Sequence, residues 1–437
     1  MKHFLLPAFL CLIASCCSPR EYDITDYGAR TGRADNAAAI NRAISRCSRA
    51  GGGKVIVPEG TFITGTVVLK SGVTLHLDKG AIILGTGDLS AYRSMESAED
   101  LSKYDSGDGT VNSNNSKDTR WNRALILAVG EERIAIEGEG TIDGAHVFDP
   151  EGEESMRGPH TVLFSGVTDF SLSGISIRRA ANYAFMAYDV HDGTFSGLTV
   201  TEGWDGIHIR GGERIVISDC SFKTGDDAIA GGYWEGMRIH GCDINTSCNG
   251  IRIIMPVRDV LIDSCRFRGP GEFPHRTSGE RRRRNMLAAL NLQPGGWGKA
   301  PGDVDGVTFR DITADSVATP LMMTLNEGNR CGTVIVENLK ATGVYGAAMS
   351  VESWKGGQYD TVLFKNISVQ YVGAANPALR DLPVGPPPAD WRPLPCWGLY
   401  SREVKHLRLE NVSLSCSGTE YRPAFLFENV GEVFRSP

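Results

Sequence analysis

The amino-acid sequence predicts an all-β chain that folds as a parallel β-solenoid, and three observations support this prediction. Segments that begin at Asp205, Asp227 and Asn249 share one pattern and follow each other at steps of 22 and 22 residues. Short β-branched stretches alternate with Gly, Asn and Asp turns at the same period. Glycine supplies 52 of 437 residues, about 12% against a usual value of about 7%. Such a period is typical of a solenoid in which each coil pairs with its neighbours.

The repeat can be followed through most of the chain by its second apolar position. This position falls, at steps of 23, 22, 22, 23, 47, 27, 28 and 45 residues, on Ile175, Leu198, Cys220, Cys242, Cys265, Ile312, Leu339, Ile367 and Val412. The two long steps predict excursions, which are segments that leave the strands, at residues 270–300 and Pro377 to Pro395. The polar residues 93–121 predict another. Because a repeat protein of this length can be one unit, we expect one domain over residues 22–430.

A helix is expected before the first coils. Asp35 or Asn36 can cap an amphipathic run from Ala37 to about Ser48, which three glycines then end. Its apolar residues fall on one face. An open end of a solenoid exposes strand edges and apolar interior, so it needs a cover. We predict that this helix is the N-terminal cap.

Residues 1–15 predict an export signal. Lys2 and His3 precede the apolar run Phe4 to Ala14, and the following Cys16 matches the lipidated cysteine of bacterial lipoproteins. The run is too short to span a bilayer, and a plain secretory signal is the alternative. We therefore expect an exported protein, periplasmic or an outer-membrane lipoprotein of a bacterium, that touches the membrane only through its N-terminal lipid.

Charge and cysteine spacing restrict the partners. A net charge of −7 offers no general attraction for nucleic acid, so an acidic ligand would need a local basic patch. Cys220, Cys242 and Cys265 occupy equivalent places in the repeat and predict a buried ladder of thiols rather than disulfides. No Cys-x-x-Cys pair or histidine cluster completes a zinc site. We expect a monomer without metal or cofactor.

Three aspartates form the candidate catalytic site. Neighbouring strands lie about 4.8 Å apart, so Asp205 and Asp227 on successive coils can share one site. Adjacent Asp226 would face the opposite side in an unbroken strand, but Gly225 indicates a turn there. Clustered carboxylates cannot all ionise at their usual pKa, so one can protonate a glycosidic oxygen while another activates water. A single aspartate in a turn would more simply bond to backbone amides.

Four segments resemble the polygalacturonase-type glycoside hydrolases of family 28. They are Tyr22 to Ala29, Gly51 to Pro58, Leu75 to Leu77 and Gly138 to Gly144. The resemblance covers roughly residues 22–430. It implies a single-domain right-handed parallel β-helix of the pectin lyase-like type that cleaves pectic chains with inversion.

The resemblance also implies residue roles. The family's Gly-Asp-Asp is intact at Gly225 to Asp227, whereas Asp205 alone remains of its Asn-Thr-Asp. Asp226 would be the general acid, and Asp205 with Asp227 would hold and activate water. Asn249 stands where the family has a histidine, and the Arg-x-Lys substrate clamp has no clean counterpart. The basic run Arg281 to Arg284 either replaces the clamp or is a solvated loop.

The remaining candidates are expected to bind substrate. The rings of Trp204 and Trp234 can stack on sugars, although packing of loops is the alternative. Asn249, Arg252 and Arg283 can bind polar groups of the substrate.

The sequence thus predicts a hydrolase, with polygalacturonase-like activity, for α-linkages in a pectic or related acidic polysaccharide or its oligosaccharides. The excursions would favour cleavage from a chain end. A calcium-dependent β-helical polysaccharide lyase and a non-catalytic surface glycan-binding protein are the two rival predictions.

Overall fold

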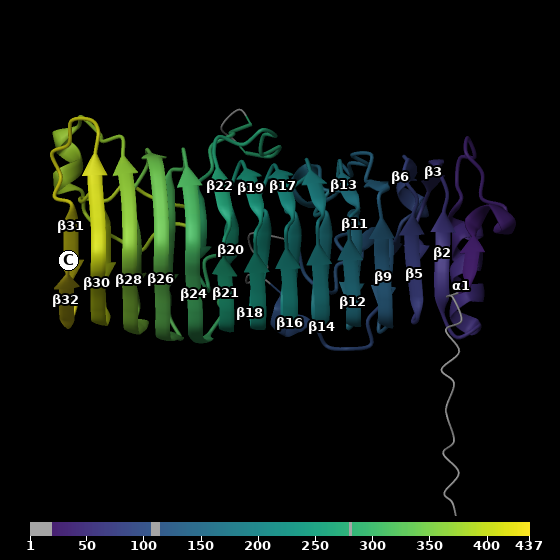
Figure 1. Ribbon diagram of the computed structural model, residues 1–437, viewed down its shortest axis with the longest axis horizontal. Helices are drawn as coiled ribbons and strands as arrows, with labels where there is room; N and C mark the ends of the chain where they lie inside the picture. Colours follow the sequence, from purple (N-terminus) through teal and green to yellow (C-terminus); the bar gives the residue numbers. More distant parts are fainter. Residues whose placement is uncertain (1–19, 106–113, 279–281) are drawn as a thin grey trace, which may run out of the picture.

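The computed structural model describes residues 20–105, 114–278 and 282–437. It shows parallel strands stacked along one long axis, with the N-terminal helix at one end and β32 at the other (Figure 1). The predicted signal peptide 1–15 and Cys16 lie outside the described residues, so export and lipidation stay predictions. Among the described helices, none combines the length and the apolar character needed to cross a membrane.

The strands form three faces. The first face pairs, in order, β1 (Glu21–Asp23), β2 (Gly53–Val57), β5 (Val73–Leu77), β9 (Glu132–Gly138), β12 (Thr168–Ser173), β14 (Phe185–Ser196), β16 (Ile207–Ser218), β18 (Ile229–His240), β21 (Val257–Asp263), β24 (Gly302–Asp315), β26 (Asn329–Val344), β28 (Gln358–Tyr371), β30 (Val404–Cys416) and β32 (Glu432–Ser436).

The second face shares the beginnings of β14, β16 and β18, because these long strands bend between two faces. Its other strands are β4 (Val67–Val68), β8 (Arg123–Val129), β11 (His160–Ser165), β20 (Ile251–Ile253), β23 (Ala288–Leu292), β25 (Thr319–Leu325), β27 (Met349–Ser353), β29 (Leu399–Arg402) and β31 (Phe425–Glu428). The short β7 (Arg93–Ser94) pairs antiparallel with β8.

At its C-terminal end, the third face is formed by the final residues of the long strands β24, β26, β28 and β30. Before them it contains β3 (Gly60–Thr64), β6 (Ala81–Gly85), β10 (Thr141–Asp143), β13 (Ser176–Arg178), β15 (Thr199–Thr201), β17 (Ser221–Thr224), β19 (Asp243–Thr246) and β22 (Arg266–Arg268). Short 3-10 helices lie between strands at η1 (Ile24–Tyr27), η2 (Leu89–Ala91), η3 (Ser102–Tyr104), η4 (Glu153–Ser155) and η5 (Pro377–Asp381).

The strand register follows the sequence repeat. On the second face Ile207 pairs with Ile229, which pairs with Ile251. Asp205, Asp227 and Asn249 each lie two residues before one of these isoleucines, and therefore occupy the same place on three successive coils. Towards the C-terminus the predicted positions also pair with each other, in the order Ile312, Leu339, Ile367 and Val412.

The interior of the solenoid is a continuous apolar core. Cys220, Cys242 and Cys265 are each 1% exposed and carry free thiols. Each Sγ lies 3.2 to 3.5 Å from the carbonyl oxygen two residues earlier. The predicted ladder of buried cysteines is thus confirmed.

The predicted N-terminal helix is present as α1 (Ala37–Arg49). Its buried side chains, among them Ile40 and Ile44, join the core at the first coils. The side chain of Asp35, not that of Asn36, accepts from the first backbone amide of the helix, at 2.8 Å. Asn36 instead bonds to the backbone of Arg30 and Ile63, which fastens the helix to the end of the solenoid.

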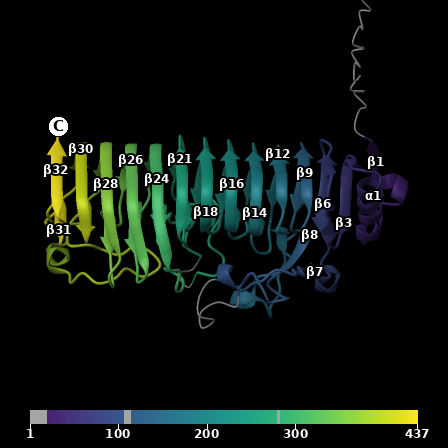
Figure 2. The same cartoon turned by 90° about the horizontal axis from the view of Figure 1, so that it is seen from below.

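Four long segments interrupt the coils. Three of them, 86–122, 269–287 and 372–398, overlap the predicted excursions, and residues 106–113 and 279–281 within them lie outside the described residues. The predicted excursion 270–300 is wrong over its last part, because Ala288–Leu292 form β23 and continue the second face. The fourth, 144–159, was not predicted, because its length of 16 residues still fits one irregular coil. Figure 2 shows loops gathered beside one edge of the strands. All four supply residues to one cavity on the second face.

Candidate active site

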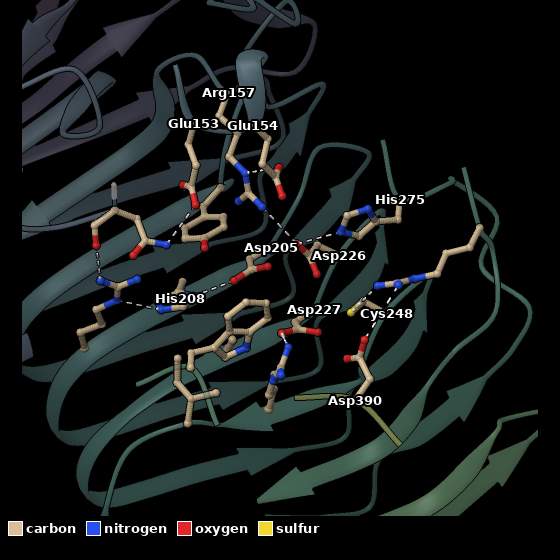
Figure 3. A pocket seen from close by; sticks show the side chains of 18 residues that line it. Glu153, Glu154, Arg157, Asp205, His208, Asp226, Asp227, Cys248, His275 and Asp390 are labelled. Carbon is tan, nitrogen blue, oxygen red and sulfur yellow. Dashed lines mark hydrogen bonds and ion pairs between the residues drawn. The ribbon is translucent and has the colours of Figure 1, made fainter. Parts of the chain in front are cut away.

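The cavity lies over β16, β18 and β20 and has a volume of about 230 Å³ (Figure 3). The coils provide its floor, which includes Asp205, Asp226 and Asp227. The excursions provide its walls. Their side chains in the cavity are Asn114, Glu153, Glu154, Arg157, His275, Arg283 and Asp390, and Trp297 joins them from the connection between β23 and β24.

Both members of the Asp226 and Asp227 pair face the cavity. They lie in a bend between β17 and β18, so the alternation of a regular strand does not apply. Gly225 allows neighbouring backbone to pack closely at this bend, since a Cβ there would come within 2.6 Å of the carbonyl oxygen of Gly203 and within 2.8 Å of that of Pro274. The same close approach brings the 269–287 segment, with His275, over the acids.

Asp227 is held by the next coil. Its Oδ1 accepts from the backbone N and the Nδ2 of Asn249 at 2.8 and 2.9 Å. Its Oδ2 lies 3.7 Å from Nη1 of Arg252. Asn249 is fully buried and meets the acid rather than open space, so it positions Asp227 and is not exposed to a sugar.

Asp205 is held by a chain of two side chains from β16, the strand that follows it. Its Oδ2 lies 2.6 Å from Nδ1 of His208, and Nε of Arg210 lies 3.1 Å from Nε2 of the same ring. Arg210 can only donate, so Nε2 must accept and Nδ1 must carry the proton given to Asp205. His208 is therefore a neutral donor, with its pKa well below the usual value because of burial and the adjacent Arg210 charge.

Asp226 is held by the excursions instead. Its Oδ2 lies 3.5 Å from Nη2 of Arg157 and 3.4 Å from Nε2 of His275. The Nε of Arg157 donates in turn to Glu154 at 2.8 Å. The Asp226 side chain is 13% exposed, which leaves it in contact with the cavity.

These surroundings separate the pKa values of the three acids. Burial, followed by the charges of the other two aspartates, raises the pKa of Asp205 well above its usual value. Burial also raises the pKa of Asp227, against the opposing effect of Arg252. Burial acts on Asp226 too, but His275 and Arg157 outweigh it and lower its pKa. In the free protein Asp226 is thus the acid most strongly held as a carboxylate.

Two predicted basic residues reach the cavity. The guanidinium of Arg252 lies 5.0 Å from the ring centre of Trp297 and donates to the backbone of Ala389 at 2.8 Å. Arg283 lies 3.3 Å from Sγ of Cys248 and 4.0 Å from Asp390. Arg284 turns away to the backbone of Glu272, and Arg281 lies outside the described residues.

The predicted sugar-stacking role of two tryptophans is wrong. Trp204 is fully buried beneath Arg157, and its Nε1 donates to Glu154 at 3.2 Å. Trp234 is 1% exposed in the core, where its Nε1 donates to the backbone of Ile209 at 2.8 Å. Neither ring has a free face for a sugar, because one supports an excursion and the other fills the solenoid.

Several cavity residues had no sequence signal of function. Arg157 lies in the unpredicted segment 144–159, and His275 lies in a predicted excursion where no motif marks it as functional. Cys248 precedes Asn249 in the repeat, so the repeat predicts its position on the coil but indicates no function for its thiol. Side chains from long segments have no fixed spacing to the coils, so the repeat could not locate them.

His208 is expected to set the acidic limb of the pH profile. Changing His208→Ala removes the donor to Asp205, so the pKa of Asp205 should rise further. A base must be deprotonated, and the acidic limb of activity should therefore move to higher pH. His208→Asn keeps a donor near Nδ1 and should restore the limb. His240→Asn, which changes a half-exposed histidine paired with Asp263 at 2.8 Å, is the matched control.

Comparisons with known proteins agree with this fold. A family described as a right handed beta helix region matches residues 160–272, which confirms the predicted right-handed parallel β-helix. The solved family 28 exopolygalacturonase of Yersinia enterocolitica superposes with a TM-score of 0.69 at 17% identity, covering 94% of this chain and 78% of that structure.

Two curated relatives resemble the sequence. The exo-poly-alpha-D-galacturonosidase of Dickeya chrysanthemi is 26% identical over 253 residues, which are 48% of this chain and 42% of the relative. The chain therefore spans less than half the length of that relative. The polygalacturonase of Nicotiana tabacum is 23% identical over 393 residues, which are 82% of this chain and 86% of the relative.

Proposed function

Because this chain is similar to polygalacturonases in sequence and to a family 28 enzyme in fold, we propose that it is a glycoside hydrolase for α-linkages in a pectic or related acidic glycan. Fold alone does not specify activity. The observation that supports hydrolysis is that Asp205, Asp226 and Asp227 all line one cavity, where one carboxyl group can protonate a leaving oxygen while another activates water.

We propose that Asp226 protonates the leaving oxygen while Asp205 and Asp227 hold and activate water. Oxygens of Asp226 and Asp227 lie within 4.8 Å of each other, closer than is usual for an inverting acid and base. Inversion therefore depends on Asp205 to place the water. The anomeric form of the first product, followed by NMR, tests this proposal, since a retained configuration would contradict it.

The charges of the cavity support an acidic substrate. The side chains of Arg157, Arg252 and Arg283 all line it. Arg157 Nη1 and Arg252 Nε are buried without a partner among the described residues. A uronate carboxylate can accept from guanidinium groups in this way.

The same charges oppose the lyase alternative. Asp226, Asp227 and Cys248 bring potential metal-ligand atoms within 4.8 Å of one another. A calcium ion at this place would meet the positive charges of Arg157, Arg252 and Arg283 and a thiol, whereas calcium prefers oxygen ligands. The donor set does not fit such an ion.

The test of hydrolysis is a panel of pectic polysaccharides and oligosaccharides with analysis of the products. New reducing ends without unsaturated sugars support a hydrolase. Unsaturated products that disappear with a chelator would indicate a lyase. Glycan binding that survives replacement of all three aspartates, without cleavage of any substrate, would indicate a binding protein.

We further propose cleavage from a chain end, because the 372–398 segment closes the cavity on one side. Arg392 holds this segment through Nη1 and Nη2, at 2.9 and 2.7 Å from the buried carboxylate of Glu352. The segment also covers polar residues beside the second face. One of them is Gln293, which is 2% exposed and whose Nε2 donates to the backbone oxygen of Pro388 at 2.9 Å.

Arg392→Ala is expected to loosen the 372–398 segment and to lengthen the products. The wild type should release short products throughout digestion of a polymer, and the variant should add a mixture of longer ones. Chromatography of early products measures the change. Arg380 lies in the same segment, and among the residues that the structure describes its one ion pair is with the adjacent exposed Asp381, so Arg380→Ala should leave product length unchanged. Identical products from Arg392→Ala and the wild type would contradict the closing role.

A further inference from the structure

Asp226 is paired with two cations that do not belong to the coils. Arg157 comes from the 144–159 segment and His275 from the 269–287 segment, and both approach the same oxygen, Oδ2 (Figure 3). A general acid needs a proton, yet these two partners stabilise its carboxylate form. The free site is thus arranged against the role that the proposed function gives to Asp226.

Arg157 has unused capacity to donate hydrogen bonds. Its guanidinium lies 5.1 Å from the ring centre of Trp204 and 5.4 Å from that of Tyr183, and its Nε is bound to Glu154. Its Nη1 is buried without a partner among the described residues, although the side chain lines the cavity. A buried unpaired donor is unfavourable. A ligand that brings an anionic acceptor would relieve it, and a carboxylate matches a guanidinium in charge and geometry.

Other titratable groups also face Asp226. From the coils these are the charged side chains of Asp205, Asp227 and Arg252, the neutral imidazole of His208 and the thiol of Cys248. From the excursions these are Glu153, Glu154 and Arg283, besides the two direct partners. The acids in this set favour protonation of Asp226. Arg157 and His275 are in direct contact with it, so their removal changes its charge most.

We infer that the carboxylate of a bound substrate takes Arg157 away from Asp226 and adds its own negative charge beside this acid, and thereby allows Asp226 to bind the proton it later donates. The inference rests on the proposed hydrolysis and narrows its substrate to a glycan with a free carboxylate at the cleavage site. The proton comes from solvent, so binding of the anion consumes one proton. Discrimination between acidic and neutral sugars then arises in catalysis as well as in binding.

This exchange, in which Arg157 leaves Asp226 for the substrate carboxylate, should be visible in the pH profile. The alkaline limb of kcat/KM reports the acid in the free enzyme, and that of kcat reports it in the complex. Arg157 and His275 lower the pKa of Asp226 in the free protein. The alkaline limb of kcat/KM should therefore lie at lower pH than that of kcat on a polygalacturonate oligosaccharide. In Arg157→Gln the two limbs should approach each other.

A second measurement does not require hydrolysis. Calorimetry of D-galacturonate binding in buffers with different ionisation enthalpies gives the number of protons taken up. We expect uptake with galacturonate on the wild type, no uptake with neutral D-galactose, and loss of the uptake in Arg157→Gln. Arg157→Lys keeps the positive charge and should retain part of the proton uptake. Arg238→Gln, which changes an exposed arginine paired with Asp259 at 2.8 Å, is the matched control.

The substrate preference is the third measurement. The wild type should favour the free acid over its methyl ester by about 100-fold in kcat/KM, and Arg157→Gln should lose most of that preference. Galacturonate binding without proton uptake, or no binding at all, would overturn the inference. Proton uptake without cleavage of any glycan would instead sink the proposed hydrolysis and leave the exchange standing. Circular dichroism of each variant confirms that it folds.

Discussion

Replacing Asp226 by Asn is expected to lower kcat by about 10²- to 10⁴-fold, the usual contribution of general acid–base catalysis. The amide has the size of the acid but cannot transfer its proton to a leaving glycosidic oxygen. The loss should be smaller on an aryl glycoside with a good leaving group, because that group departs without full protonation. Both rates are measured on the purified variant at the wild-type pH optimum.

A matched control separates catalysis from folding. Asp243→Asn changes a half-exposed aspartate whose carboxylate bonds to Arg268 at 2.8 Å outside the cavity, and it should leave kcat unchanged. Unchanged turnover by a folded Asp226→Asn protein would remove Asp226 from the mechanism. Equal losses on substrates with good and poor leaving groups would argue against the acid role specifically.

Trp234→Ala is expected to lower the free energy of unfolding by about 3–5 kcal/mol, the usual cost of truncating a buried tryptophan. The ring lies in the solenoid core at 1% exposure, and its Nε1 donates to Ile209 at 2.8 Å. The substitution removes both the packing and the hydrogen bond. Urea unfolding followed by circular dichroism measures the change.

The control for this prediction is Trp391→Ala, because Trp391 lies partly exposed in the 372–398 segment and should cost less stability. Activity per folded molecule of Trp234→Ala should remain at a permissive temperature. Loss of substrate binding with wild-type stability would restore the sugar-stacking role that its burial contradicts.

Much of the fold follows from the repeat alone. A shift of one residue in the register between paired strands would turn apolar side chains outward. The period of 22 residues therefore determines which coil positions lie over each other. This constraint placed Asp205, Asp227 and Asn249 in one column, and it placed Cys220 with its two partners in the core. The helix followed from its own apolar face and its Asp35 cap.

The candidate site was predictable only in its floor. The three aspartates belong to coils, and the structure brings all three to the cavity. Trp204 and Trp234 also belong to coils, but nearness in sequence to an acid did not show which way their rings point. Both rings are buried, since a large apolar side chain gains more from the interior than from a wet cavity.

The sequence by itself determined the stacking of coils, the column of acids and the buried cysteine ladder, because each depends on a period that strand pairing enforces. Only the tertiary structure decided which cations meet those acids. Arg157 and His275 reach Asp226 from segments 144–159 and 269–287, whose paths no period constrains. The position of the acids is thus a property of the repeat, whereas the charge state of Asp226 depends on the excursions folded over it.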